Sequence, residues 1–181
     1  MSGLVVGLDA NVLVPIIACD VLLTAFDHGL YEPVVSTTVL DEVERTLIDG
    51  FPHLPSEAIR SRVVAMRSVL DDQLVEAETR GVPVEINPKD RHVVGAALQG
   101  EATLVVTNDG RLRNEIVASG LALRGVDLDT FMTTLWESAP ADVVSVVDSL
   151  IRKRRRPPVT KSEMLASIES HMPNLVERLT R

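Results

Sequence analysis

With 181 residues, 45% of them hydrophobic, the chain can build one sizeable core with a modest appendage, which excludes two full enzymatic domains. Its net charge of −8 excludes a protein that coats nucleic acid by general electrostatics, because neutralising phosphates requires a surplus of Lys and Arg. The single cysteine, Cys19, excludes an intrachain disulfide and a zinc cage built from cysteines.

The N-terminal segment carries no signal that would direct the chain to a membrane. It lacks the basic region that opens a signal peptide, and Asp9 and Asp20 interrupt its apolar runs well before the length of a membrane span. We therefore expect a cytoplasmic protein that is not inserted in a membrane.

Strands alternate with helices through the first two thirds of the chain. The apolar run 4–8 is bounded by Gly3 and Asp9 and is too short for a helix, so it predicts a buried strand. The later elements, by the same reasoning, are a helix from Pro15 to near Gly29, a strand at 33–35, a helix opened by a capping box of Thr38 and Asp41 and ended by Gly50, a helix at 56–72, a strand at 82–86, a helix at 89–99, a strand at 104–107, a helix through Leu112 and Ile116 ended by Gly120, and a strand within 121–126. This alternation predicts parallel βαβ units and an α/β/α sandwich.

After residue 138 the chain changes to helices alone. Apolar residues repeat at helical spacing through 143–151, and Thr160 with Glu163 predicts a second capping box. We therefore divide the chain into an α/β domain, 1–138, and a helical C-terminal extension, 139–181. The extension is expected to pack on the first domain.

Four acidic residues stand where a parallel sheet collects its ligands. Asp9 and Asp109 follow predicted strands, and Glu42 and Asp90 lie near the starts of helices. Four carboxylates converging there would repel one another strongly unless hard cations such as Mg²⁺ or Mn²⁺ offset their charge. Such a cation can lower the pKa of a bound water and orient it for attack on a phosphodiester.

In this order and context the four acids resemble the motifs of the PIN-domain family, in particular the VapC-type toxins of bacterial toxin–antitoxin pairs. The matching segments are Asp9-Ala10-Asn11-Val12-Leu13, Leu40-Asp41-Glu42-Val43-Glu44-Arg45-Thr46-Leu47, Pro88-Lys89-Asp90-Arg91-His92-Val93 and Leu104-Val105-Val106-Thr107-Asn108-Asp109. The extension, with Pro157-Pro158 and a helix start at Thr160, resembles the C-terminal part of a longer VapC subgroup.

The resemblance implies a PIN-like fold and a metal-dependent endoribonuclease. Asp9 and Asp90 would bind Mg²⁺ or Mn²⁺, and Glu42 and Asp109 would complete the acidic pocket directly or through water. The residues implied to orient these carboxylates are Asn11, Thr107 and Asn108. The implied substrate is RNA, often a tRNA or ribosomal RNA loop, and the implied partners are a cognate antitoxin protein that blocks the site and a second copy of the chain in a homodimer.

Other interpretations of the acidic motifs fit less well. A haloacid-dehalogenase-type phosphatase and a receiver domain also place an Asp after the first strand. The phosphatase needs a second Asp where this chain has Asn11, and the receiver usually carries paired acids near its N-terminus. The remaining alternative is a degenerate PIN domain that acts as a protein-binding module without nuclease activity, and the presence of all four acids counts against it.

Two further features have both a structural and a functional interpretation. We assign His92 no metal or proton-transfer role, because a histidine beside an apolar helix is more often packed or hydrogen-bonded. A basic block in the extension is a helix end whose charge suits the helix dipole, or else a contact for RNA or the antitoxin. Its members are Arg152, Lys153, Arg154, Arg155 and Arg156.

Overall fold

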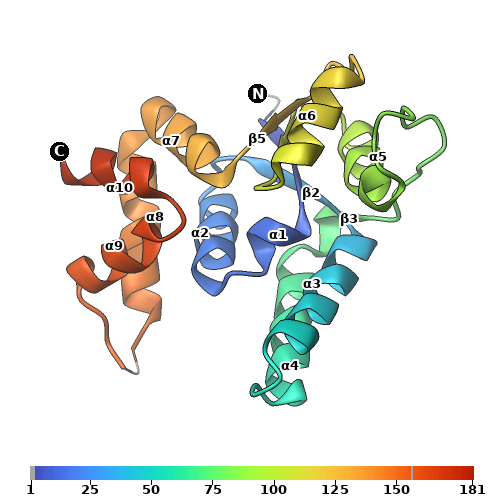
Figure 1. The fold of residues 1–181 in the computed structure, drawn as a ribbon. Helices are drawn as coiled ribbons and strands as arrows, with labels where there is room; N and C mark the ends of the chain where they lie inside the picture. Colours follow the sequence, from blue (N-terminus) through green and yellow to red (C-terminus); the bar gives the residue numbers. More distant parts are fainter. Residues whose placement is uncertain (1–2, 156) are drawn as a thin grey trace.

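A parallel sheet organises the molecule, whose computed structural model describes residues 3–155 and 157–181. Within these ranges five strands form one sheet in the order β3-β2-β1-β4-β5 (Figure 1). The strands are β1 (Val5–Leu8), β2 (Glu32–Ser36), β3 (Leu74–Val75), β4 (Leu104–Val106) and β5 (Arg124–Val126). Every pair of neighbours is parallel, so the predicted α/β class is confirmed.

Helices fill the connections between the strands and form the whole C-terminal part. They are α1 (Ala10–Leu13), α2 (Ile16–Asp27), α3 (Thr37–Gly50), α4 (Ser56–Val69), α5 (Arg91–Gln99), α6 (Gly110–Ala118), α7 (Leu128–Ser138), α8 (Pro140–Lys153), α9 (Lys161–Glu169) and α10 (Pro173–Thr180), with short 3₁₀ turns η1 (Asp71–Gln73) and η2 (Pro88–Asp90). Across the described ranges, no helix is both long and apolar enough to cross a membrane.

Close packing fixes α5 against the centre of the sheet. The helix lies across β1, β2 and β4. A Cβ atom at Gly7 of β1 would lie 3.0 Å from the Cβ of Ala97, and one at Gly100 would lie 2.9 Å from a methyl group of Val34, so larger side chains would push the layers apart. The start of α5, where Asp90 lies, is thereby held at a fixed distance from the end of β1.

The strand predicted at 82–86 is absent, and this prediction was wrong. The N–H of Ile86 donates to the carbonyl of Pro83 at 3.1 Å, which makes a turn, and Val84 is 82% exposed. Proline has no N–H to give to a sheet, so the run could not pair along its length. The edge strand is β3 instead, whose Leu74 and Val75 pair with β2.

The predicted start of α3 was wrong by two residues, whereas the second predicted capping box is confirmed. Ser36, the last residue of β2, is the N-cap of α3, and its Oγ accepts the N–H of Val39 at 3.2 Å. The expected box of Thr38 and Asp41 does not form there, because the strand runs directly into the helix. In α9, the predicted reciprocal box of Thr160 and Glu163 is present. The end of α3 follows Gly50, as expected.

The C-terminal helices gather beside α2, as the orange and red ribbons of Figure 1 show. Helix α8 packs on α2, and α7 packs on α8 and α10. Val143 and Val146 of α8 belong to the same buried hydrophobic cluster as Leu22 of α2, so the two parts of the chain share one core. The expected packing of the extension on the first domain is confirmed, while the boundary at 138 stays a prediction.

A buried carboxylate anchors the last helix. Asp129 of α7 is 8% exposed and accepts the backbone N–H of Leu175 and both the backbone and side-chain N–H groups of Asn174. These bonds use the free N–H groups at the start of α10, which no carbonyl within that helix can reach.

We predict that Asp129→Ala lowers the free energy of unfolding by about 2–3 kcal/mol, because it leaves the buried N–H of Leu175 and the part-buried N–H groups of Asn174 without their acceptor. Urea denaturation followed by circular dichroism measures the loss. Asp142→Ala removes an exposed carboxylate from the first turn of α8 and should cost less than about 0.5 kcal/mol. Equal losses in the two variants would contradict the anchoring role of Asp129.

Candidate active site

Four carboxylates from four separate elements line one pocket of about 490 Å³ at the carboxyl edge of the sheet. Asp9 follows β1 and Asp109 follows the neighbouring β4. Glu42 comes from α3 and Asp90 from η2, just before α5. The structure thus brings together all four acids singled out from the sequence. Asp41, the neighbour of Glu42, turns away and pairs with Arg67 at 2.6 Å.

Asp9 is the most deeply buried of the four acids. It is 7% exposed, its Oδ1 accepts the N–H of Ala10 at 2.7 Å, and its Oδ2 accepts Oγ1–H of Thr107 at 2.7 Å and Nδ2–H of Asn11 at 2.6 Å. Burial raises the pKa of Asp9 above the usual aspartate value, although the bonds from Thr107 and Ala10 act in the opposite direction. The carboxylate is therefore fixed in orientation but costly to ionise.

The residues expected to orient the carboxylates form a connected network around Asp9. Asn11 and Thr107 contact the carboxylate directly, and Asn11 Nδ2 also lies 2.9 Å from Thr107 Oγ1. Asn108 acts differently, because its backbone N–H donates to Asn11 while its side-chain oxygen accepts the N–H of Leu128. Asn108 therefore joins the pocket to the start of α7 and touches no carboxylate through its side chain.

The side chain of Glu42 contacts His92, to which the sequence assigned no role in the site. The Nε2 atom of His92 lies 3.2 Å from Oε1 of Glu42, and its Nδ1 atom lies 2.8 Å from Oγ of Ser36. An ionised carboxylate can only accept, so Nε2 carries the hydrogen and the hydroxyl of Ser36 donates to Nδ1 when the ring is neutral. His92 thereby positions Glu42; its place two residues after Asp90 was the available signal.

Asp90 and Asp109 share an arginine. The Nη2 atom of Arg111 lies 3.0 Å from Oδ2 of Asp90 and 3.5 Å from Oδ2 of Asp109. Burial raises the pKa of Asp90, against the lowering effect of Lys89 and Arg111. Burial also acts to raise the pKa of Asp109, but the N–H groups of Arg111 and Leu112 and the nearby cations hold it below the usual value. No motif in the sequence pointed to Arg111.

The donor atoms of the pocket suit a hard divalent cation, because Mg²⁺ and Mn²⁺ prefer carboxylate oxygen. In the part of the chain that the structure describes, no three acidic, histidine or cysteine side chains lie close enough together to hold one ion as they stand. The carboxylates are instead paired with side chains of the protein, and Asp90 and Asp109 share Arg111. A cation bound by several of them would require these side chains to rotate toward the middle of the pocket.

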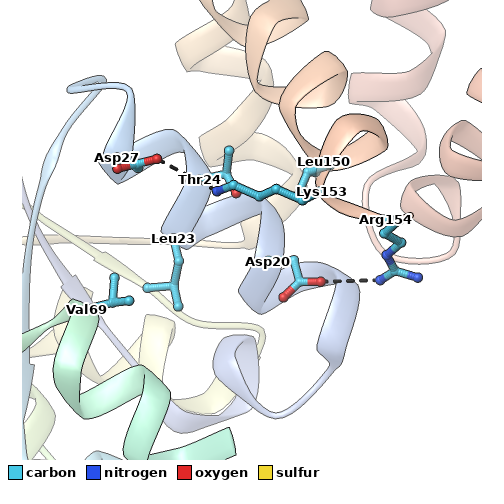
Figure 2. Close-up of a pocket in the computed structure, with 8 residues that line it drawn as sticks. All are labelled: Asp20, Leu23, Thr24, Asp27, Val69, Leu150, Lys153 and Arg154. Atoms are coloured by element: carbon cyan, nitrogen blue, oxygen red, sulfur yellow. Dashed lines mark hydrogen bonds and ion pairs between the residues drawn. The ribbon is translucent and has the colours of Figure 1, made fainter. Parts of the chain in front are cut away.

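The basic block of the extension contacts its own chain. A pocket of about 440 Å³ lies between α2 and α8. Lys153 pairs there with Asp27 at 3.7 Å, and Arg154, just after α8, pairs with Asp20 at 3.3 Å (Figure 2). Arg152 donates to Ser149 within α8. These contacts dock the extension on α2. Contact of the block with RNA or an antitoxin stays a prediction, and Arg156 lies outside the described residues.

We predict that Asp109→Ala lowers stability by about 1 kcal/mol at pH 7, because Asp109 is the N-cap of α6 and accepts the N–H groups of Arg111 and Leu112. Since the folded pKa is depressed, this contribution is fully present above the unfolded pKa and is lost as the pH falls through the folded pKa. Urea denaturation at several pH values should therefore show the difference from the unaltered chain shrinking below about pH 4.

Asp109→Asn is the matched control, because asparagine also caps helices but does not titrate. The stability difference between the Asn and Ala variants should stay constant with pH, since neither carries the titrating group. If the Ala variant and the unaltered chain differ in stability by the same amount at low and at neutral pH, the expected pH dependence is refuted.

Comparison with protein families confirms the resemblance seen in the motifs. A model of the PIN domain matches residues 5–111, which include all four acids, and a model of the VapC50 C-terminal domain matches residues 128–181, from the first residue of α7 onward. No curated protein and no solved structure gives a significant match. The chain therefore belongs to the PIN domain family and carries a C-terminal domain of the VapC50 type.

Proposed function

We propose that the chain is a metal-dependent endoribonuclease that cleaves phosphodiester bonds of RNA. The observation that carries the proposal is the convergence of Asp9, Glu42, Asp90 and Asp109 on one pocket from four separate elements. A folded chain gains no stability from bringing mutually repulsive carboxylates together, and such a set serves cation binding well. The PIN domain match supports a nuclease.

The residues of the pocket divide between cation binding and RNA binding. Asp9 and Asp90, with Glu42 and Asp109 beside them, would hold Mg²⁺ or Mn²⁺, which when bound supplies an activated water and neutralises phosphoryl charge. Hydrogen bonds from Thr107 and Asn11 fix the orientation of the Asp9 carboxylate, and a hydrogen bond from His92 does the same for Glu42. The cationic side chains that line the same pocket, and so can bind the RNA backbone, are Arg45 and Lys89.

The proposed biological role is that of the toxin in a type II toxin–antitoxin pair. The VapC50 C-terminal domain match supports this role, because the same chain carries the PIN domain. We further propose a cytoplasmic location, a tRNA or ribosomal RNA loop as the substrate, a cognate antitoxin that covers the pocket, and a homodimer. These proposals depend on the family resemblance.

We predict that the purified chain cuts total cellular RNA into discrete fragments with Mg²⁺ or Mn²⁺, and that chelator stops the cleavage. Asp90→Asn should lower the rate by at least about a hundredfold, because it removes a charged ligand from the pocket. Asp41→Asn is the control, since it removes the same charge from a carboxylate that pairs with Arg67 outside the pocket; its rate should stay within about twofold. Intact RNA under every condition, with the chain folded and free of antitoxin, would favour a protein-binding module without nuclease activity.

His92 provides a second prediction, which does not depend on RNA. His92→Leu should weaken Mn²⁺ binding about tenfold, because Glu42 loses the group that directs it. His92→Gln should recover part of the affinity, since its amide can donate to the same oxygen. Calorimetric titration of Mn²⁺ measures both variants, with circular dichroism as the test of folding. Affinities in the Leu and Gln variants equal to that of the unaltered chain would show that His92 does not position Glu42.

A further inference from the structure

Arg111 holds two of the pocket carboxylates together. Its Nη2 atom lies within 3.5 Å of a carboxylate oxygen of both Asp90 and Asp109, and its own backbone N–H donates to the other oxygen of Asp109 at 2.8 Å. Its Nε atom lies 3.6 Å from Glu115, one turn further along α6. The guanidinium therefore spans the gap between η2 and α6 at the edge of the pocket.

A divalent cation held between the Oδ2 atoms of Asp90 and Asp109 would use the same oxygens that Arg111 contacts. Cation–carboxylate distances are roughly 2.0–2.6 Å. A guanidinium that contacts both Oδ2 atoms fills the space in which such an ion would have to lie, and two cations cannot share that space. An ion held by both Oδ2 atoms therefore requires Arg111 to leave them.

We propose that Arg111 is an internal counter-ion of the acidic pocket, which the divalent cation displaces when it binds to Asp90 and Asp109. This inference rests on the proposed metal-dependent function. It assigns Arg111 a definite effect: by competing for the two carboxylates, the guanidinium lowers the affinity of the pocket for the cation. The metal concentration needed to fill the pocket then depends on Arg111 as well as on the carboxylate ligands.

The surroundings of Arg111 allow the exchange. Its side chain is 47% exposed, so it can swing outward without opening the core. Glu115 offers the displaced guanidinium a second partner, and Glu115 is itself held in place because its Oε2 accepts the N–H of Asn87 at 2.9 Å. The movement is a side-chain rotation that leaves α6 and its N-cap intact.

Lys89 serves as the matched control for charge. It lines the same pocket and approaches the same Asp90, but its Nζ atom stays 3.9 Å from Oδ1 and its side chain is 59% exposed. Replacing Lys89 therefore removes one positive charge from the pocket without removing a competitor for the two Oδ2 atoms. The comparison separates displacement from general electrostatic attraction.

The test is calorimetric titration of Mn²⁺ into the full chain and into Arg111→Met, Arg111→Lys and Lys89→Met. Methionine keeps the apolar stem of either residue and removes its charge. Arg111→Met should bind Mn²⁺ about three- to tenfold more tightly, as expected for the loss of two partly exposed ion pairs. Lys89→Met should tighten binding less than Arg111→Met, because it removes a nearby charge but no competitor for the two Oδ2 atoms. Arg111→Lys should have an affinity between those of the unaltered chain and Arg111→Met. Circular dichroism confirms folding of each variant.

Nuclear magnetic resonance of the arginine side chains gives a direct readout. Addition of Mg²⁺ should shift the Nε–H signal of Arg111, identified by its loss in Arg111→Lys. The signal of Arg62, whose guanidinium donates to the carbonyls of Leu13 and Val14, should stay in place.

The outcomes separate this inference from the proposed function. If Arg111→Met binds Mn²⁺ as the unaltered chain does or more weakly, the displacement of Arg111 is overturned. The same holds if Arg111→Met and Lys89→Met tighten binding equally. Either result leaves the nuclease proposal intact. Tightening specific to Arg111→Met in a chain that cuts no RNA would support the displacement and refute the nuclease. Absence of Mn²⁺ binding in every folded variant would overturn both.

Discussion

Mutual repulsion among the carboxylates at one edge of the sheet is the constraint on which the whole site depends. Burial adds a second cost of ionisation, since it raises the pKa of Asp9 and Asp90. The structure offsets the cost by giving each acid at least one hydrogen-bond or ion-pair donor. The donors are Thr107 and Asn11 for Asp9, His92 for Glu42, and Arg111 for Asp90 and Asp109.

The order of the strands makes this arrangement possible. Because β1 lies between β2 and β4, the residues that follow these three strands emerge side by side. Helix α5 then packs closely on Gly7 and brings Asp90 to the same edge. The C-terminal helices support α2, because α8 packs on it. The ion pairs of Lys153 and Arg154 with Asp27 and Asp20 hold the two segments together.

The elements that could be predicted are those whose signal is local. The strand at 4–8 and the capping box at Thr160 are each specified by residues within a few positions of one another, and both are present. The predictions for 82–86 and for the start of α3 failed for the opposite reason. The partner of β2 at the sheet edge, and the length to which β2 extends before α3 begins, depend on pairing with a distant segment.

By itself, the sequence determined that Asp9 and Asp109 meet, because parallel strands end at a common edge and each of the two acids lies within three residues of the end of a strand. It also determined the family, through four motifs in fixed order. Only the tertiary structure decided how the acids are held. The contacts of His92 with Glu42 and of Arg111 with Asp90 join residues 50 and 21 positions apart. Helical or strand periodicity reports which face a residue occupies, whereas such contacts are set by the packing of one element against another.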